Sequence, residues 1–312
     1  MKKTRLLSLC ALESAFANSI AESIGIKLTS VDNKTFSKGE VKSYPLESVR
    51  GCRCFIIAQY HDDENVNSQI MRICVLTDAL IRASAKQVIL VVPFLPYMRQ
   101  DYRSKPREPI TAKLTAKLLK KAGIRHIITY DLHGKSTEGF FTRVDNPGFT
   151  TILSDHLKNL NDLNLSNLII STGDTGGTTR VSKLAGKLDL DFVVVYKNRK
   201  STNEIDKMSL LGDVLGKDVL VFDDITDTGG TLVKATDTLL EHGAKSVSVA
   251  VTHLFMDDEL IRILSNSKIQ RVFTSDSIFH KSLPEKFTEI SLMEKTYNMI
   301  KQISKDQPVD LS

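Results

Sequence analysis

Runs of consecutive hydrophobic residues, rich in Val and Ile, recur along the chain and alternate with helix-like segments of mixed character. Continuous apolar runs are typical of strands that are buried on both faces of a parallel sheet. Two of the mixed segments end at a glycine, Gly123 and Gly243, which is a usual helix stop. This alternation predicts parallel sheets flanked by helices. The predicted strands are CFIIAQ (54–59), QVILVVPF (87–94), HIITYDLH (126–133), NLIIST (167–172), DFVVVYK (191–197), DVLVFDD (218–224), SVSVAVTHLF (246–255) and RVFTSD (271–276), and the predicted helices are 67–84, 111–123, 178–188 and 231–243.

The first residues, MKKTRLLSLCALESAFA, have the basic start, apolar stretch and Ala-x-Ala-like end of a secretory signal. The apolar run from Leu6 to Leu12 is short and contains polar residues, and Glu13 follows it directly. We therefore predict a first strand followed by a helix. A run of about 18 consecutive apolar residues, which a membrane span requires, is absent from the sequence.

A weak internal repeat divides the chain. The order strand, loop, helix, Ala-Lys-x-Val and strand occurs first within 54–94 and again within 219–255. A chain of 312 residues is long enough for two domains of ordinary size. We predict two domains of one fold, 1–147 and 148–312, with the boundary near Asn146–Gly148. The alternative is that any two strand–helix–strand units look alike.

Composition and charge limit the class of partner. Hydrophobic residues make up 41% and charged residues 25%, and the net charge is only +5, without a concentrated basic stripe. A nucleic-acid partner is therefore not expected. The local cluster Lys197–Lys200 suits small anionic ligands better. The cysteines do not have the spacing of a zinc site, and we expect inert thiols in a reducing compartment at Cys10, Cys52, Cys54 and Cys74.

The stretch VLVFDDITDTGGTL, Val219–Leu232, carries the clearest chemistry. It lies where a predicted parallel strand ends and a predicted helix begins, which is the edge at which open α/β sheets bind ligands. In the turn Thr228–Thr231, glycines allow close approach, backbone N–H groups and two hydroxyls can donate, and the helix adds its positive end. The turn therefore predicts a phosphate site. It is neither a Gly-x-x-x-x-Gly-Lys-Ser/Thr loop nor a Gly-x-Gly-x-x-Gly fingerprint.

Two adjacent carboxylates, Asp223 and Asp224, precede this turn. They would repel a phosphate unless they serve another group. Ionised carboxylates accept hydrogen bonds from sugar hydroxyls and bind Mg²⁺ together with phosphate oxygens. The stretch thus predicts a sugar-phosphate site, with the phosphate on the turn and the hydroxyls on the acids. The alternative is a capped helix start with solvated acids.

VFDDITDTGGTL (221–232) resembles the phosphoribosyl-pyrophosphate-binding motif of type I phosphoribosyltransferases and ribose-phosphate pyrophosphokinases. The resemblance implies an α/β fold of two duplicated phosphoribosyltransferase-like domains, each a mainly parallel sheet flanked by helices. It implies that Asp223 and Asp224 face the ribose hydroxyls. The ribose 5-phosphate would be held by Asp227, Thr228, Gly229, Gly230 and Thr231.

Further motifs, which together span nearly the whole chain, are similar to those of ribose-phosphate pyrophosphokinases. The long segment 93–134 resembles a signature of that family, and TFSKGE (35–40) resembles its adenine-binding element. STGDTGGTTR (171–180) stands where the family has Ser-Pro-Asp-x-Gly-Gly, and YKNR (196–199) matches its Lys-x-Arg loop. These matches imply ATP-binding roles for Phe36, Glu40, Arg99, Gln100, Asp101 and His133, metal-binding roles for His133 and Asp174, and catalytic roles for Lys197 and Arg199.

The resemblance implies an enzyme, a pyrophosphokinase-type transferase. It would move the β,γ-diphosphate of ATP to O1 of ribose 5-phosphate with Mg²⁺ as cofactor, giving phosphoribosyl pyrophosphate (PRPP) and AMP. Phosphoryl transfer depends on positioning and charge neutralisation, which Lys197 and Arg199 can supply. The family implies self-association from dimer to hexamer with a shared ATP site, and a cytoplasmic location, or the host cytoplasm for a phage-encoded chain.

Three departures leave alternatives open. Lys38 stands near the adenine where the family usually has Asp or Asn, Gly173 replaces a proline before Asp174, and Tyr196 replaces a histidine before Lys197. Some relatives, including phage-type enzymes, transfer the diphosphate to ADP-ribose instead of ribose 5-phosphate. A non-catalytic regulatory homologue and a salvage phosphoribosyltransferase are the remaining alternatives. Regulation by phosphate or nucleotides cannot be assumed from the motifs.

Overall fold

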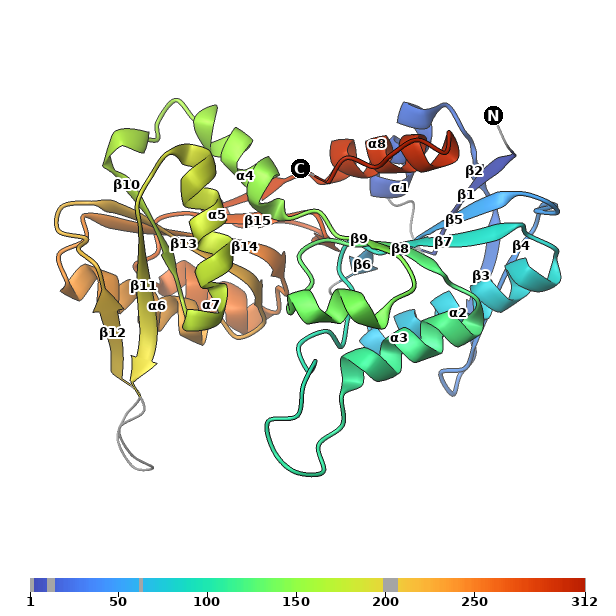
Figure 1. Ribbon diagram of the computed structural model, residues 1–312, viewed down its shortest axis with the longest axis horizontal. Helices are drawn as coiled ribbons and strands as arrows, with labels where there is room; N and C mark the ends of the chain where they lie inside the picture. The colour runs from blue at the N-terminus through green and yellow to red at the C-terminus, as the bar shows by residue number, and fades with distance from the viewer. Residues whose placement is uncertain (1–2, 10–14, 62–63, 199–206, 312) are drawn as a thin grey trace. The chain divides into compact units, whose positions relative to one another are not determined.

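The computed structural model describes residues 3–9, 15–61, 64–198 and 207–311, with only the backbone for Lys197, Asn198 and Lys207. The chain divides into two compact units (Figure 1). Unit 1 contains 1–147, 277–279 and 292–312, and unit 2 contains 148–276 and 280–291. The prediction that 148–312 forms a domain by itself is wrong in its last part. The C-terminal helix belongs to unit 1, because it packs against a helix near the N-terminus.

Unit 1 is built on a six-stranded, fully parallel sheet with the order β2-β1-β5-β7-β8-β9. Its central strands are almost completely buried, which explains their unbroken apolar sequences. The strands are β1 (Thr4–Ser8), β2 (Leu28–Thr29), β5 (Arg53–Ile57), β7 (Gln87–Val91), β8 (His126–Ile128) and β9 (Val144–Asp145).

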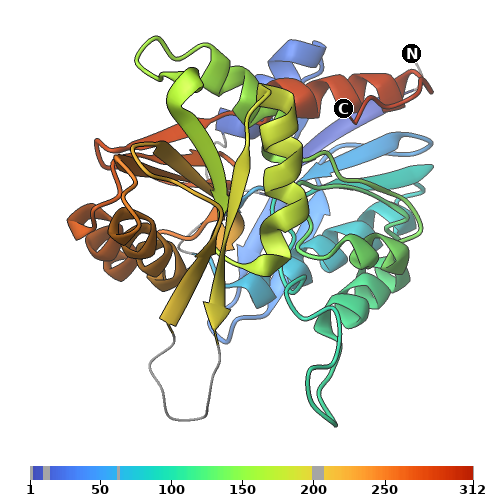
Figure 2. The same ribbon diagram turned by 60° about the vertical axis from the view of Figure 1, so that its left-hand side comes forward.

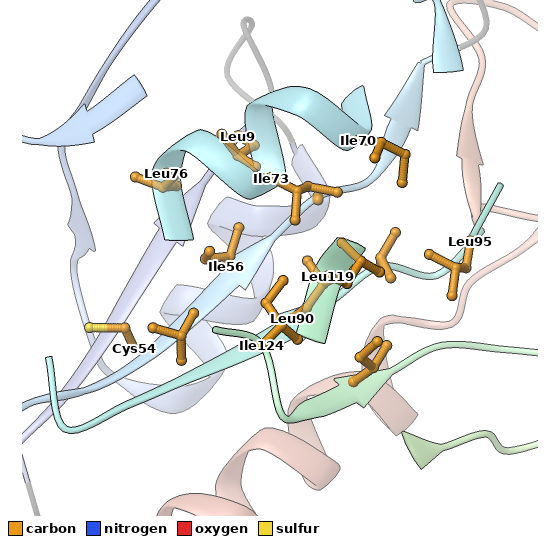
Figure 3. Packing of buried hydrophobic residues seen from close by; sticks show 14 of the residues in the cluster. Leu9, Cys54, Ile56, Ile70, Ile73, Leu76, Leu90, Leu95, Leu119 and Ile124 are labelled. Atoms are coloured by element: carbon orange, nitrogen blue, oxygen red, sulfur yellow. The ribbon is translucent and has the colours of Figure 1, made fainter. Parts of the chain in front are cut away.

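Helices cover both faces of this sheet (Figure 1). Helices α1 (Ala15–Ile24) and α8 (Met293–Ser304) lie on one face and contact each other, and α2 (Val66–Arg82) and α3 (Thr111–Ala122) lie on the other. Alternate strand residues such as Ile56 and Leu90 pack against Ile73 and Leu76 of α2 and Leu119 of α3 (Figure 3). The two-faced covering is what a parallel sheet needs to bury its apolar side chains.

The boundaries of α2 and α3 follow from local signals. The side chain of Asn65 accepts a hydrogen bond from the backbone N–H of Asn67 at 2.8 Å and caps the start of α2. Gly123 ends α3 with a φ of 120°, a left-handed conformation that glycine adopts without strain.

Small elements complete unit 1. Strands β3 (Val31–Thr35) and β4 (Val41–Pro45) form an antiparallel hairpin. Strand β6 (Tyr60–His61) pairs in parallel with β16 (Ile278–Phe279), which is contributed by the returning chain. A 3₁₀ helix, η1 (Lys135–Phe140), follows β8.

Unit 2 is built on a seven-stranded sheet with the order β12-β11-β10-β13-β14-β15-β17. All neighbours are parallel except β12, which is antiparallel to β11. The strands are β10 (Leu168–Thr172), β11 (Phe192–Asn198), β12 (Lys207–Leu211), β13 (Asp218–Thr226), β14 (Ser246–Leu254), β15 (Val272–Ser275) and β17 (Phe287–Ile290).

Helices also cover both faces of the second sheet (Figure 2). The turned view shows α4 (Phe149–Lys158) and α5 (Thr178–Leu188) on one face. The other face carries α6 (Gly230–Glu241) and α7 (Asp258–Asn266), whose Leu232, Leu239 and Leu264 join the core of strand valines. Two 3₁₀ turns, η2 (Leu165–Asn167) and η3 (Thr175–Gly177), flank β10.

The elements predicted from the hydrophobic pattern are confirmed. Each of the eight apolar runs contains a strand, each of the four mixed segments contains a helix, and a strand followed by a helix opens the chain. The predicted fold class, α/β with two mainly parallel sheets flanked by helices, is also confirmed.

Candidate active site

The turn after β13 has the backbone that a phosphate site needs. Gly229 adopts a φ of 67° and its N–H donates to Thr226 Oγ1 at 3.2 Å. A Cβ on Gly229 would lie 2.7 Å from Leu260 Cδ1, so this position requires glycine. The N-cap residue of α6 is Gly229, which has no side chain to cap the helix, and the first N–H groups of α6, from Gly230 and Thr231 onward, lack intrahelical partners and can bind an anion.

The two acids before the turn lie at the carboxyl end of β13. The side chains of Asp223 and Asp224 are only 17% and 5% exposed, and the Asp224 N–H donates to Asp223 Oδ1 at 2.9 Å. Burial, and then the charge of Asp224, raise the pKa of Asp223 well above its usual range. Two crowded carboxylates of this kind need hydroxyl donors or cations to stabilise their charge.

Arg180 provides part of the positive charge that stabilises the two acids, and it is not among the site residues predicted from the sequence. Its Nη1 lies 3.5 Å from Asp223 Oδ1 and its Nη2 lies 3.4 Å from Asp224 Oδ2. It projects from the first turn of α5, and its guanidinium lies 5.8 Å from the centre of the Phe222 ring. The available signal was its position as the last residue of STGDTGGTTR.

The turn after β10 repeats the sequence of the turn after β13, since Asp-Thr-Gly-Gly-Thr occurs at 174–178 and again at 227–231. Strands β10 and β13 are neighbours, so both turns lie at the same edge of the sheet. Asp174 is exposed and its Oδ1 accepts from the Gly177 N–H at 3.0 Å. Its charge is the smallest of the causes that raise the pKa of Asp223, after burial and Asp224.

The residues predicted to bind ATP gather in two places in unit 1. Asp101 packs directly on the backbone next to His133, since a Cβ on Gly134 would lie 1.9 Å from Asp101 Oδ2. The Ser136 hydroxyl donates to the same carboxylate at 3.5 Å. Arg99 and His133 are exposed, and the carbonyl of half-buried Gln100 accepts from Ala112 at the start of α3.

Phe36 and Glu40 lie apart from that group, at the tip of the β3–β4 hairpin. The Phe36 N–H donates to the Glu40 carbonyl at 2.8 Å, which closes the tip. The Phe36 side chain is 51% exposed, and Lys38 is exposed beside it. A large aromatic side chain held on an exposed turn is suited to a contact with another molecule.

The two predicted catalytic residues are only partly covered by the structure. The backbone of Lys197 lies near the end of β11, opposite Met208 of β12, and its side chain is outside the described residues. Arg199 lies outside the described residues altogether. Tyr196, which precedes them, is half-buried.

No described group of three or more His, Cys, Asp or Glu side chains forms a preformed metal cage. Mg²⁺ commonly binds through one or two carboxylates plus substrate phosphates, so a missing cage is compatible with it. Asp174 fits that pattern, because it is exposed and engages only one carboxylate oxygen in the turn.

Two family profiles match most of the chain. The N-terminal domain of ribose phosphate pyrophosphokinase matches residues 6–123, and the phosphoribosyl transferase domain matches residues 144–288. Ribose-phosphate pyrophosphokinase 2 of Saccharomyces cerevisiae is 39% identical over 263 residues, which is 84% of this chain and 82% of the relative. The chain belongs to the ribose-phosphate pyrophosphokinase family. The predicted enzyme class, a pyrophosphokinase-type transferase, is thereby confirmed.

Other relatives support the same membership in the ribose-phosphate pyrophosphokinase family. The Bacillus subtilis ribose-phosphate pyrophosphokinase is 37% identical over 289 residues, covering 92% of this chain and 86% of the relative. The crystal structure of phosphoribosylpyrophosphate synthetase from Mycobacterium smegmatis superposes with a TM-score of 0.90 at 29% identity, covering 98% of this chain and 100% of that one. The predicted pair of phosphoribosyltransferase-like domains is therefore confirmed.

The matched ranges of this pyrophosphokinase family include most of the candidate site. Asp174, Arg180 and the segment 223–231 fall within the phosphoribosyl transferase match, and Phe36, Glu40 and 99–101 fall within the N-terminal match. Within the described part of the chain, none of the helices has the length and apolar character of a membrane span.

Proposed function

We propose that this chain transfers the β,γ-diphosphate of ATP to O1 of ribose 5-phosphate in the presence of Mg²⁺, giving PRPP and AMP. The observation that carries this proposal is the largely buried Asp223–Asp224 pair beside the start of α6, where the N-cap residue is a glycine. A sugar phosphate satisfies both parts, because its hydroxyls donate to the acids and its phosphate accepts from the turn.

On the acceptor side, Asp227, Thr228, Gly229, Gly230 and Thr231 would bind the 5-phosphate. Asp227 and Thr228 are exposed, and the N–H groups of the turn supply donors at fixed positions. This arrangement anchors the acceptor at its 5′ end. Because the acids hold the other hydroxyls of the ring, the anomeric oxygen O1 remains unbound and is the oxygen that can attack.

On the donor side, Arg99, Gln100, Asp101 and His133 would bind ATP. Asp101 packs on the backbone of Gly134, so this contact holds the two segments together. A contact of this kind lowers the cost of ordering the site when the nucleotide binds. Phe36 and Glu40 would contact adenine from a neighbouring subunit, which makes at least a dimer part of the proposal.

Lys197 and Arg199 would neutralise charge on the transferred group, and loss of one such contact typically costs about 3–4 kcal/mol of transition-state stabilisation. His133 and Asp174 are each proposed as ligands of Mg²⁺. The ion would neutralise phosphate charge and orient the phosphate oxygens. The reaction needs no covalent nucleophile from the protein, because the sugar hydroxyl attacks directly. We place the enzyme in the cytoplasm.

An acceptor screen tests the proposal. The purified protein is incubated with ATP, Mg²⁺ and either ribose 5-phosphate or ADP-ribose, and the products are identified by mass spectrometry. We expect AMP and PRPP with ribose 5-phosphate. If product forms with ADP-ribose and not with ribose 5-phosphate, then ADP-ribose is the acceptor. No AMP with either acceptor would point to a non-catalytic homologue.

Consumption of PRPP with a nucleobase distinguishes the last alternative. A salvage phosphoribosyltransferase would release pyrophosphate from PRPP and would not use ATP.

An Asp224→Asn variant serves as the control for the acceptor site, since it removes one acid of the pair while keeping the size of the side chain. It should lose the activity with ribose 5-phosphate.

A further inference from the structure

The guanidinium of Arg180 lies across the two acids of the acceptor site. Its two terminal nitrogens address different carboxylates, Nη1 to Asp223 and Nη2 to Asp224. The planar fork of arginine can do this because its donors are fixed relative to one another. One side chain thus restrains both acids at once.

The separations of 3.5 and 3.4 Å are longer than the 2.7–2.9 Å typical of a charge-assisted hydrogen bond. Arg180 therefore stabilises the negative charges without a tight hydrogen bond to either carboxylate. The acids keep accepting capacity for other donors, which a close bidentate pair would consume. The geometry suits a residue that stabilises the acids better than one that competes with their ligand for hydrogen bonds.

Arg180 is itself fixed in place. It is 15% exposed and lies over the ring of fully buried Phe222, the residue before the acids. It extends from α5, which begins where the Asp174 turn ends. A Cβ on Gly177 would lie 3.7 Å from Arg180 Nη1, so the turn packs against the guanidinium. Its position depends on packing as well as on charge.

The local charges are unbalanced. Asp224 and Asp174 both raise the pKa of Asp223, and among the described side chains Arg180 is the cation that offsets this charge. The charge of Arg180 lowers the pKa of Asp223 against the effects of burial and Asp224, so without Arg180 the two carboxylates would turn apart or hold a shared proton more tightly. In either case they would present fewer acceptors to a sugar.

We propose that Arg180 is a positioning residue that holds the Asp223 and Asp224 carboxylates ready for sugar hydroxyls and so sets the preference for hydroxyl-bearing acceptors. This inference rests on the proposed function. It assigns Arg180 no contact with the phosphate. Its effect should therefore depend on the hydroxyls of the ligand, which a general loss of structure or of phosphate binding would not reproduce.

The test compares ribose 5-phosphate with 2-deoxyribose 5-phosphate, which lacks one hydroxyl. Binding of each is measured by titration calorimetry without ATP for the wild type, Arg180→Met and Arg180→Lys. We expect the wild type to prefer ribose 5-phosphate. Arg180→Met should weaken ribose 5-phosphate binding about tenfold or more, the usual cost of hydrogen bonds to charged groups, and change 2-deoxyribose 5-phosphate binding much less.

Arg180→Lys keeps a charge but cannot span both acids, so it should lose part of the preference for ribose 5-phosphate over 2-deoxyribose 5-phosphate. Because it retains the charge, it should fold even if Arg180→Met does not. Arg262→Met, at an exposed position on α7, is the matched control and should retain the full preference. Equal weakening of both ligands by the Arg180 variants would mean that Arg180 acts on the phosphate and would overturn the inference.

The outcomes separate the inference from the function on which it rests. A wild type that does not prefer ribose 5-phosphate would overturn the proposed acceptor site itself. A wild type with the preference, together with an unchanged preference in both Arg180 variants, would overturn only the role of Arg180.

Discussion

Gly229 and Gly230 are adjacent but should respond to alanine in opposite ways. At Gly229, the φ of 67° costs alanine about 1–2 kcal/mol. The new methyl would also lie 2.7 Å from Leu260 Cδ1 and 3.1 Å from Leu264 Cδ2, two buried core side chains. Such overpacking costs about 1–3 kcal/mol, so Gly229→Ala should destabilise the protein by about 2–5 kcal/mol in total.

At Gly230, a methyl meets no atom within 4 Å and the residue begins α6. Alanine is favoured over glycine in a helix by about 0.5–1 kcal/mol, so Gly230→Ala should be neutral or slightly stabilising. Its methyl would nevertheless project from the turn proposed to bind phosphate. We expect ribose 5-phosphate binding to fall by about tenfold or more, because a phosphate could no longer reach the backbone donors.

Urea unfolding followed by circular dichroism measures the stability of both variants, and calorimetric titration with ribose 5-phosphate measures binding by Gly230→Ala. The change in the urea midpoint of the unit 2 transition is the relevant quantity, because a protein of two units need not unfold in one step. Wild-type stability in Gly229→Ala would refute the steric reasoning. Wild-type affinity in Gly230→Ala would show that the turn does not approach the ligand.

Three further changes test other parts of the structure. Burial and Asp224 raise the pKa of Asp223 from 3.8 to about 8, so between these values the folded state keeps a proton that the unfolded state loses. The stability of the wild type should therefore fall as the pH rises from about 4 to about 8. Asp223→Asn should remove this fall, and thermal unfolding should show the stability advantage of the variant over the wild type growing with pH by at least about 1 kcal/mol. Gly134→Ala would displace Asp101 and should raise the KM for ATP about tenfold to a hundredfold, which steady-state kinetics measures. Titration should show an unchanged affinity for ribose 5-phosphate. An unchanged KM would count against an ATP role for Asp101. Tyr130→Phe removes a hydroxyl that lies 2.8 Å from Thr296 Oγ1 and should lower the free energy of unfolding by about 1 kcal/mol in urea, and no change would mean that this buried bond is energetically neutral.

The strands and helices could be predicted from the sequence because their patterns are local. A short apolar run such as 219–222 favours a buried strand through its length and its β-branched and aromatic residues, and Gly123 marks a helix end by itself. The return of α8 to unit 1 could not be predicted in this way. It depends on the contacts of α8 with α1 and on the hydrogen bonds of the Tyr130 hydroxyl, and both partners are distant in the sequence from α8.

The acceptor site divides in the same manner. The acid pair and the glycine turn are contiguous in sequence, so their joint chemistry could be predicted. Arg180 joins them only through the adjacency of β10 and β13, which the sequence does not state. The motif STGDTGGTTR resembles its family element through Asp174 and the glycines, and its sequence assigns no role to the arginine six residues after Asp174.

The return of residues 292–312 to unit 1 has a consequence for synthesis on the ribosome. Unit 1 contains β1 and also α8, whose Ile303 carbonyl accepts from Arg53. All of unit 2 is translated before α8 appears. Unit 1 is therefore not completed until after unit 2 has been translated, and until then the apolar side of α1 has no α8 to cover it. A nascent chain released before α8 is made would contain all of unit 2 and a unit 1 without the helix that packs on α1.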